Sequence, residues 1–216
     1  MWEAEKKMVL DTAQQMVARG LVVGTMGNVS MRLKTPAGEE YIAITPSSCY
    51  YDSLTSDDIA IVNFTGECVN GGKRPSIETM LHKGIYEVRE SVKAIVHCHS
   101  LFSCVVSVTA KEIPPLLDEQ VVCLGGAIPV ADYALPGSKE LVKSVVAALG
   151  KRNAVIMANH GALSVGKDLK EALTNSEMLE KIARIYIYGL GTGTMKLLPD
   201  EALKMEQSLF NAQCDV

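Results

Sequence analysis

Ala94-Ile95-Val96-His97-Cys98-His99, near the middle of the chain, is an apolar run that ends in two histidines. The run predicts a strand over residues 94–97. Because side chains alternate along a strand, His97 and His99 face one side of it and Cys98 faces the other. The two imidazoles can converge on a metal ion, or they can be two polar side chains with ordinary hydrogen bonds. The pair alone does not decide between these interpretations.

A third histidine favours the metal. His160 lies in Asn159-His160-Gly161, directly after an apolar strand expected over residues 154–158, and loops at strand ends often build sites. Three imidazoles leave the fourth position on zinc open, as a catalytic site requires. The remaining histidine, His82, falls on a predicted helix, where we expect a local hydrogen bond rather than metal ligation.

The third motif concerns a carboxylate. Pro75-Ser76-Ile77 precedes a stretch of helical periodicity and predicts a helix start, with Ser76 as its cap and Glu78 in the first turn. The amides and dipole of a helix start favour a carboxylate and also a bound phosphate. Taken alone, Glu78 is better explained as a helix-start glutamate that has no chemical role.

Two polar turns are candidates for phosphate binding. Residues 24–30 (GTMGNVS) and residues 45–48 (TPSS) carry small, hydroxyl or amide side chains next to predicted strands. Such turns can present several N–H groups to a phosphate. They are also common as purely structural turns, so neither is decisive by itself.

Periodicity and turn residues predict the elements around these motifs. Helices are expected over residues 3–18, 77–88, from about 100, 138–149, 169–188 and from 199, and strands over residues 29–33, 41–44, 59–64, 94–97, near 121, near 128, 154–158 and 162–165. This order predicts a mixed or antiparallel sheet with helices on both faces. We expect one globular domain over residues 1–216, with a mobile tail after about residue 210.

Composition limits the classes of partner. Of the 216 residues, 48% are hydrophobic and 21% charged, which is typical of a folded enzyme. The net charge of -4 includes no basic cluster, so nucleic acid is not expected as a partner. No apolar run is long enough to cross a membrane. Six cysteines without a CxxC pair suit a reducing compartment, which predicts a cytoplasmic location.

Five motifs in a fixed order carry a resemblance to a known family. They are residues 24–32 (GTMGNVSMR), 44–47 (ITPS), 75–78 (PSIE), 97–100 (HCHS) and 159–161 (NHG). Together they resemble the class II aldolase/epimerase family over nearly the whole chain, with the spacing most similar to that of its L-fuculose-1-phosphate aldolases. The resemblance implies an α/β fold, a three-layer α/β/α domain with a mostly antiparallel central sheet.

The resemblance also implies the roles of particular residues. Zn²⁺, or another divalent transition metal, would be held by His97, His99 and His160. Glu78 would be the acid/base. Phosphate would be bound by Thr25, Gly27, Asn28, Ser47 and Ser76. Members of the family are usually homotetramers with sites between subunits, and we expect the same assembly here.

The implied reaction is the cleavage of a ketose 1-phosphate, fuculose-1-phosphate-like or a 5-deoxypentulose phosphate, into dihydroxyacetone phosphate and an aldehyde, through a metal-stabilised enediolate. Two positions depart from the fuculose aldolase pattern. Ile77 stands where that enzyme has a phosphate-binding serine, and no tyrosine lies where a neighbouring subunit would supply one. Asp118 or Glu119 could transfer the proton instead.

That acidic pair keeps other functions open. Within the same fold, a pentulose-phosphate 4-epimerase or a methylthioribulose-1-phosphate dehydratase could use a carboxylate at this place. A non-catalytic scaffold similar to the adducin head is the alternative from another class. Unsatisfied buried polar groups are costly, so three candidate ligands together with Glu78 argue against a scaffold.

Overall fold

The computed structural model describes residues 2–70 and 73–214, and its centre is one eight-stranded sheet. The strands are β1 (Asn28–Lys34), β2 (Glu40–Ile44), β3 (Ala60–Asn63), β4 (Ala94–Cys98), β5 (Glu112–Ile113), β6 (Ile128–Ala131), β7 (Ala154–Met157) and β8 (Gly161–Gly166). Their order is β3-β2-β1-β4-β8-β7-β6-β5. All neighbours are antiparallel except β6 and β7. The predicted mostly antiparallel sheet is therefore confirmed.

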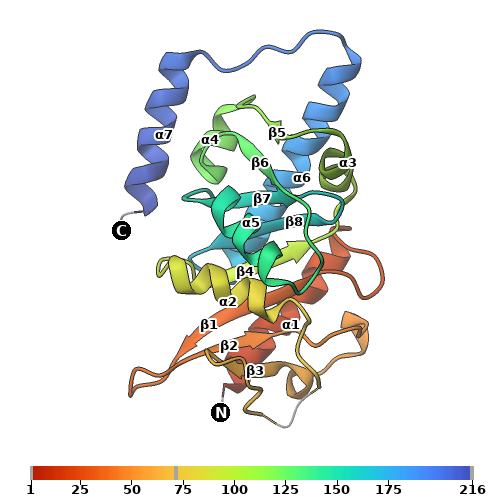
Figure 1. Cartoon of the computed structure of the whole chain (residues 1–216), viewed down its shortest axis with the longest axis vertical. Coiled ribbons are helices and arrows are strands. Elements are labelled where there is room, and N and C mark those ends of the chain that lie inside the picture. The colour runs from red at the N-terminus through yellow and green to blue at the C-terminus, as the bar shows by residue number, and fades with distance from the viewer. Residues whose placement is uncertain (1, 71–72, 215–216) are drawn as a thin grey trace.

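Helices cover both faces of the sheet (Figure 1). They are α1 (Glu3–Ala18), α2 (Thr79–Val88), α3 (Leu101–Thr109), α4 (Asp118–Leu124), α5 (Lys139–Leu149), α6 (Leu169–Gly191) and α7 (Asp200–Cys214), with short 3₁₀ turns at Tyr51–Ser53 and Ser56–Asp58. One buried apolar cluster joins α1, α3 and α6 to one face of the sheet. A second cluster joins α2 and α5 to the other face. The result is the expected three-layer α/β/α arrangement.

The central strands are apolar because both their faces are covered. Every residue of β4 and of β8 is buried. On α2, Leu81 and Ile85 lie four residues apart and are 1% and 0% exposed against the sheet. Burying each such side chain contributes about 1.5–3 kcal/mol to folding. The helical spacing that predicted α2 is thus the spacing that fixes it on the sheet.

One sequence prediction was wrong in detail. The strand expected near Val121 is the helix α4, because Asp118 and Glu119 favour a helix start and Gly125, with φ of 93°, ends it. The helix α7 continues past Phe210 to Cys214, and the mobile tail expected after about residue 210 stays a prediction. Phe210 is 3% exposed and its ring lies where a Cβ on Gly125 would be, so packing on α4 extends the helix.

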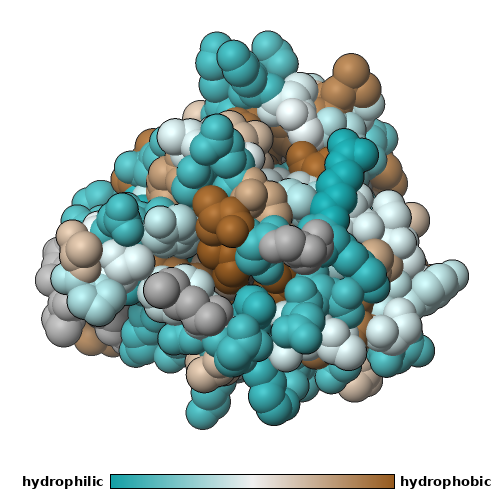
Figure 2. All heavy atoms as spheres, turned by 90° about the horizontal axis from the view of Figure 1, so that it is seen from below, coloured by the Kyte–Doolittle hydropathy of each residue, from teal (hydrophilic) through white to brown (hydrophobic). Residues whose placement is uncertain are grey.

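The end of the molecule at β3 is mainly hydrophilic. Figure 2 views it from below, where polar side chains surround a small apolar area. Small apolar areas are ordinary on a protein surface. In the described part of the chain, no helix has both the length and the apolar character that a membrane span needs.

Candidate metal centre

His97 and His99 are placed by β4, the strand between β1 and β8. His97 is fully buried, and its Nδ1 lies 2.9 Å from the carbonyl oxygen of Ala162 on β8. A carbonyl oxygen can only accept, so Nδ1 donates, and in the neutral ring the lone pair lies on Nε2. A backbone carbonyl commonly fixes a metal-binding histidine in this way.

His160 reaches the same place from the turn between β7 and β8. The preceding Asn159 has a φ of 55°, a left-handed conformation that asparagine tolerates. Gly161 begins β8, and a Cβ there would lie 2.5 Å from the Cys98 carbonyl and 2.9 Å from the ring of His99. The glycine is therefore required by space, because β8 approaches the histidines too closely for any side chain.

The three imidazoles converge. Their ligand nitrogens all lie within 4.8 Å of one another, and Nε2 of His97 is 3.0 Å from Nε2 of His99. Tetrahedral zinc with Zn–N bonds of about 2.0–2.1 Å needs nitrogens about 3.3 Å apart. His97 is buried, whereas His99 and His160 are part-buried, so the site is enclosed at His97 and partly open to solvent at the other two ligands. These residues fit a divalent transition metal.

Glu78 lies against this trio. Its Oε2 is 3.1 Å from Nε2 of His97, and its Oε1 is 3.5 Å from Nε2 of His160. Asn28 on β1 donates from Nδ2 to Oε2 at 2.8 Å. Glu78 is 5% exposed. The carboxylate thus has two imidazoles and one amide around it, within reach of any group bound by the histidines.

The local structure of Glu78 differs from the prediction. We expected Ser76 to cap the helix with Glu78 in its first turn, but Glu78 itself is the cap residue, without a side-chain cap bond. The hydroxyl of Ser76 accepts the amide of Glu78 at 3.2 Å. The Glu78 side chain makes no cap bond to its helix, and its two oxygens face His97 and His160.

The charges of Glu78 and His97 shift each other's pKa in opposite directions. Burial acts to raise the pKa of Glu78, but His97 and His160 and the bond from Asn28 outweigh it and hold that pKa well below its ordinary value. Burial alone would lower the pKa of His97, and the Glu78 carboxylate raises it above its usual range. Glu78 is accordingly ionised at neutral pH.

The two outer histidines behave differently. Burial, with His97 and His160 nearby, lowers the pKa of His99 to about 4. Burial and then His97 also lower the pKa of His160. Both rings are neutral at pH 7, which is the form that binds a metal ion.

The predicted phosphate turns lie beside the histidines. Gly27, with φ of 71°, comes so close to β4 that a Cβ would lie 2.5 Å from the carbonyl of His97. The segments that carry Ser47 and Ser76 are hydrogen-bonded to each other. The Ser47 amide donates to the Arg74 carbonyl at 2.9 Å, and the Ser76 amide donates to the Thr45 carbonyl at 3.2 Å. The Nδ2 of Asn28 donates to Glu78, and a role of Asn28 in phosphate binding stays a prediction.

Thr25 lies half-buried in the same loop. Tyr51, which the sequence did not mark as a site residue, is hydrogen-bonded to the backbone of this loop. Its hydroxyl donates to the carbonyls of Gly27 at 2.6 Å and Met26 at 3.2 Å. Burial raises the pKa of Tyr51 to about 12, so the hydroxyl stays a donor. No sequence signal marked it, because the Tyr50-Tyr51 pair follows a turn and only the fold brings it under residues 26 and 27.

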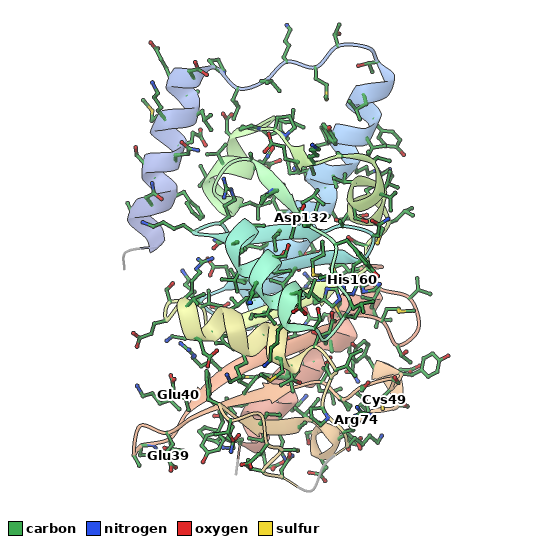
Figure 3. All side chains as sticks on the ribbon, viewed as in Figure 1. Glu39, Glu40, Cys49, Arg74, Asp132 and His160 are labelled. Atoms are coloured by element: carbon green, nitrogen blue, oxygen red, sulfur yellow. The ribbon has the colours of Figure 1, made fainter. Side chains whose placement is uncertain are left out.

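Asp118 and Glu119 are engaged elsewhere in this chain. Glu119 forms an ion pair with Lys181 of α6, and Asp118 lies near Glu206 of α7, where burial and then the Asp118 carboxylate raise the pKa of Glu206. Figure 3 shows His160 at the turn where β8 begins, apart from α4 in that view. Within one copy of the chain, the structure does not bring this acidic pair to the three histidines, so any role in the chemistry requires a second copy and stays a prediction.

Comparison with known proteins gives one family. The family model described as "Class II Aldolase and Adducin N-terminal domain" matches residues 7–187. The chain is 30% identical to 5-deoxy-D-ribulose 1-phosphate aldolase of Bacillus thuringiensis serovar kurstaki, over 94% of this chain and 93% of that one. It is 32% identical to L-fuculose phosphate aldolase of Escherichia coli K12, with the same shares covered. A solved L-fuculose 1-phosphate aldolase superposes with a TM-score of 0.88 at 30% identity, covering 95% of both chains.

The metal site yields a first prediction. Purified protein should contain about one divalent ion per chain, and His97→Ala should lose it, since one of three ligands is removed. Elemental analysis after gel filtration measures this. His82→Asn, a change at a buried histidine outside the trio, is the matched control and should keep its metal. Full metal content in His97→Ala would contradict the site.

Proposed function

The chain belongs to the Class II Aldolase and Adducin N-terminal domain family and is an enzyme of the aldolase type, and from this premise we propose that it is a zinc-dependent aldolase acting on a ketose 1-phosphate. The products are dihydroxyacetone phosphate and an aldehyde. One observation carries the proposal: three imidazole nitrogens within 4.8 Å of one another lie beside the buried, ionised Glu78. A cytoplasmic location and a homotetramer belong to the same proposal.

The division of labour follows from the chemistry of the residues. His97, His99 and His160 hold the metal, which when bound supplies positive charge to the substrate oxygens on which negative charge develops. Glu78 moves the proton at the carbon beside the substrate carbonyl, returning it in cleavage and removing it in condensation. Its lowered pKa keeps it ready as a base at neutral pH. Asn28 orients the carboxylate through its bond to Oε2.

The phosphate is bound by the turn at Thr25 and Gly27 and by the segments of Ser47 and Ser76. The amides of Ser47 and Ser76 are taken by carbonyls, so these two segments would offer their hydroxyls to the anion. The tight approach of Gly27 to β4 supports this, because it brings the turn next to the histidine strand. A ketose carrying its phosphate at one end would then lie with its carbonyl toward the metal.

Three alternatives remain as outcomes of the test. An epimerase or a dehydratase of the same fold could use Glu119 or Asp118 from a neighbouring copy. A scaffold without activity is the third possibility. It is disfavoured because Oε1 of Glu78 and Nδ1 of His160 are buried without a hydrogen bond in the described chain, and a protein without chemistry gains nothing from that cost.

The proposed reaction is tested with a panel of substrates. The zinc-loaded protein is incubated with the 1-phosphates of fuculose, rhamnulose, ribulose and 5-deoxyribulose, and triose phosphate is measured by a coupled assay. Release of dihydroxyacetone phosphate from at least one of them is expected. Retention of the carbon chain would instead indicate an epimerase, and loss of water alone a dehydratase.

The role of Glu78 gives a separate prediction. Glu78→Gln should keep its metal but lose about 10²-fold or more in kcat, because the amide cannot exchange a proton. Glu87→Gln is the control: it makes the same chemical change on the same helix, at an exposed ion pair with Lys83. Loss of metal along with activity in Glu78→Gln would make Glu78 mainly a ligand.

Glu119 is tested against its ion-pair partner. Glu119→Ala and Lys181→Ala break the same contact, but only the first removes a carboxylate. If Glu119 transfers a proton in a neighbouring site, Glu119→Ala lowers kcat by about 10²-fold while Lys181→Ala has little effect, and metal content is unchanged in both. Equal rates in the two variants would remove Glu119 from the mechanism.

A further inference from the structure

A ladder of polar side chains joins β1 to α2 beside the metal centre. Alternate residues of the strand meet every fourth residue of the helix. The pairs are Asn28 with Glu78, Ser30 with His82, and Arg32 with Tyr86. Two residues of strand span about 6.6 Å, and four residues of helix span about 6.0 Å. The spacing along the strand and along the helix therefore matches over three successive pairs. We call these three pairs the β1–α2 ladder and each pair a rung.

The middle rung fixes the position of a proton. The hydroxyl of Tyr86 is fully buried, and within the described chain its one hydrogen-bond partner is Ser30 Oγ at 2.8 Å. A buried hydroxyl donates where it can, so Tyr86 donates to Ser30. Ser30 in turn donates to Nδ1 of His82 at 2.6 Å. A neutral imidazole that accepts at Nδ1 carries its proton on Nε2.

His82 stays neutral in this place. It is 0% exposed, and burial lowers its pKa to about 3 although the Glu78 carboxylate acts in the opposite direction. Its Nε2–H is therefore a permanent donor. Among the described residues that nitrogen has no hydrogen-bond partner.

A matching acceptor lies one helical turn away. Oε1 of Glu78 is also buried without a hydrogen bond in the described chain. The amide of His82 donates to the carbonyl of Glu78 at 3.2 Å, and side chains four residues apart lie on the same face of a helix. The charges of Glu78 and His97 both act on His82, so the ring lies within electrostatic reach of the site.

Metal binding changes the surroundings of Glu78. The groups now facing its two oxygens are Nε2 of His97 and Nε2 of His160. These nitrogens are the ones that would hold a metal ion, and a nitrogen that does so carries no proton for a carboxylate. Glu78 then keeps the donor from Asn28 on Oε2 and needs another for Oε1.

We propose that His82 is a positioning residue, whose Nε2–H becomes the hydrogen-bond donor to Oε1 of Glu78 when the three histidines hold a metal ion. Each carboxylate oxygen then has one donor from the β1–α2 ladder. The two donors hold the carboxylate in a single orientation for proton transfer. The inference rests on the proposed function in one respect, that Glu78 is the acid/base.

The tautomer and the new bond can be observed without any substrate. The chain has four histidines, so two-bond proton–nitrogen correlations of the labelled protein can be assigned by single substitutions. His82 should carry its proton on Nε2, and adding zinc should move that proton downfield in wild type but not in Glu78→Ala. A proton on Nδ1, or the same shift in Glu78→Ala, would overturn the proposal.

Two variants separate the nitrogens of His82. Asparagine can replace the acceptor at Nδ1, whereas glutamine can replace the donor at Nε2. We expect His82→Asn to keep its metal and KM but to lose about tenfold to hundredfold in kcat, the range of one hydrogen bond to a charged group. His82→Gln should regain part of kcat even though its bond to Ser30 is lost.

Unfolding temperatures of both variants show whether activity follows stability. Wild-type kcat in His82→Asn, or a loss of kcat in both variants that follows their unfolding temperatures, would overturn the proposal. Failure of the proposed function looks different, because wild-type protein would then release no triose phosphate from any substrate of the panel. In that case the proton position on His82 and its response to zinc still test the inference.

Discussion

The pairing of β4 with β8 is the contact on which the metal centre depends. It sets Cys98 opposite Ala162, so the turn before β8 lies next to the end of β4 and His160 meets His97 and His99. The same pairing brings the Ala162 carbonyl to Nδ1 of His97 and so turns Nε2 toward the other rings. Gly161 permits this approach because any Cβ would strike the Cys98 carbonyl. His97 is thus fixed by the strand pairing itself, and His99 and His160 directly adjoin the paired residues.

Around this centre the protein keeps a carboxylate ionised in a buried place. Desolvation opposes the charge of Glu78, and the histidines and Asn28 outweigh it. A buried charge of this kind is costly unless it is fully paired. In the described chain, Oε1 of Glu78 and Nδ1 of His160 are buried without a hydrogen bond. Such arrangements are typical of functional sites. The β1–α2 ladder explains how the carboxylate is still held in position, since its helix is tied to the sheet at three successive levels.

Much of this could be predicted from the sequence, because the signals were local. The HxH pattern on an apolar run and the Pro-Ser start before Glu78 each reflect constraints between near neighbours. The strand predicted near Val121 failed for the same reason: its β-branched pair favours a strand locally, but the acidic start and Gly125 make a helix that packs against Phe210. A local pattern could not foresee a partner nearly ninety positions later in the printed sequence.

The sequence by itself determined the elements, the donor types and the family, since periodicity, turns and ordered motifs are written along the chain. Only the tertiary structure decided that Asn28 donates to Glu78, that Tyr51 supports the glycine turn, and that Nδ1 of His82 is hydrogen-bonded to Ser30. It also decided that Glu119 pairs with Lys181, away from the histidines of its own chain. The physical reason is that hydrogen bonds are directional and short, so partners 50 positions apart are chosen by sheet register and helix placement rather than by composition.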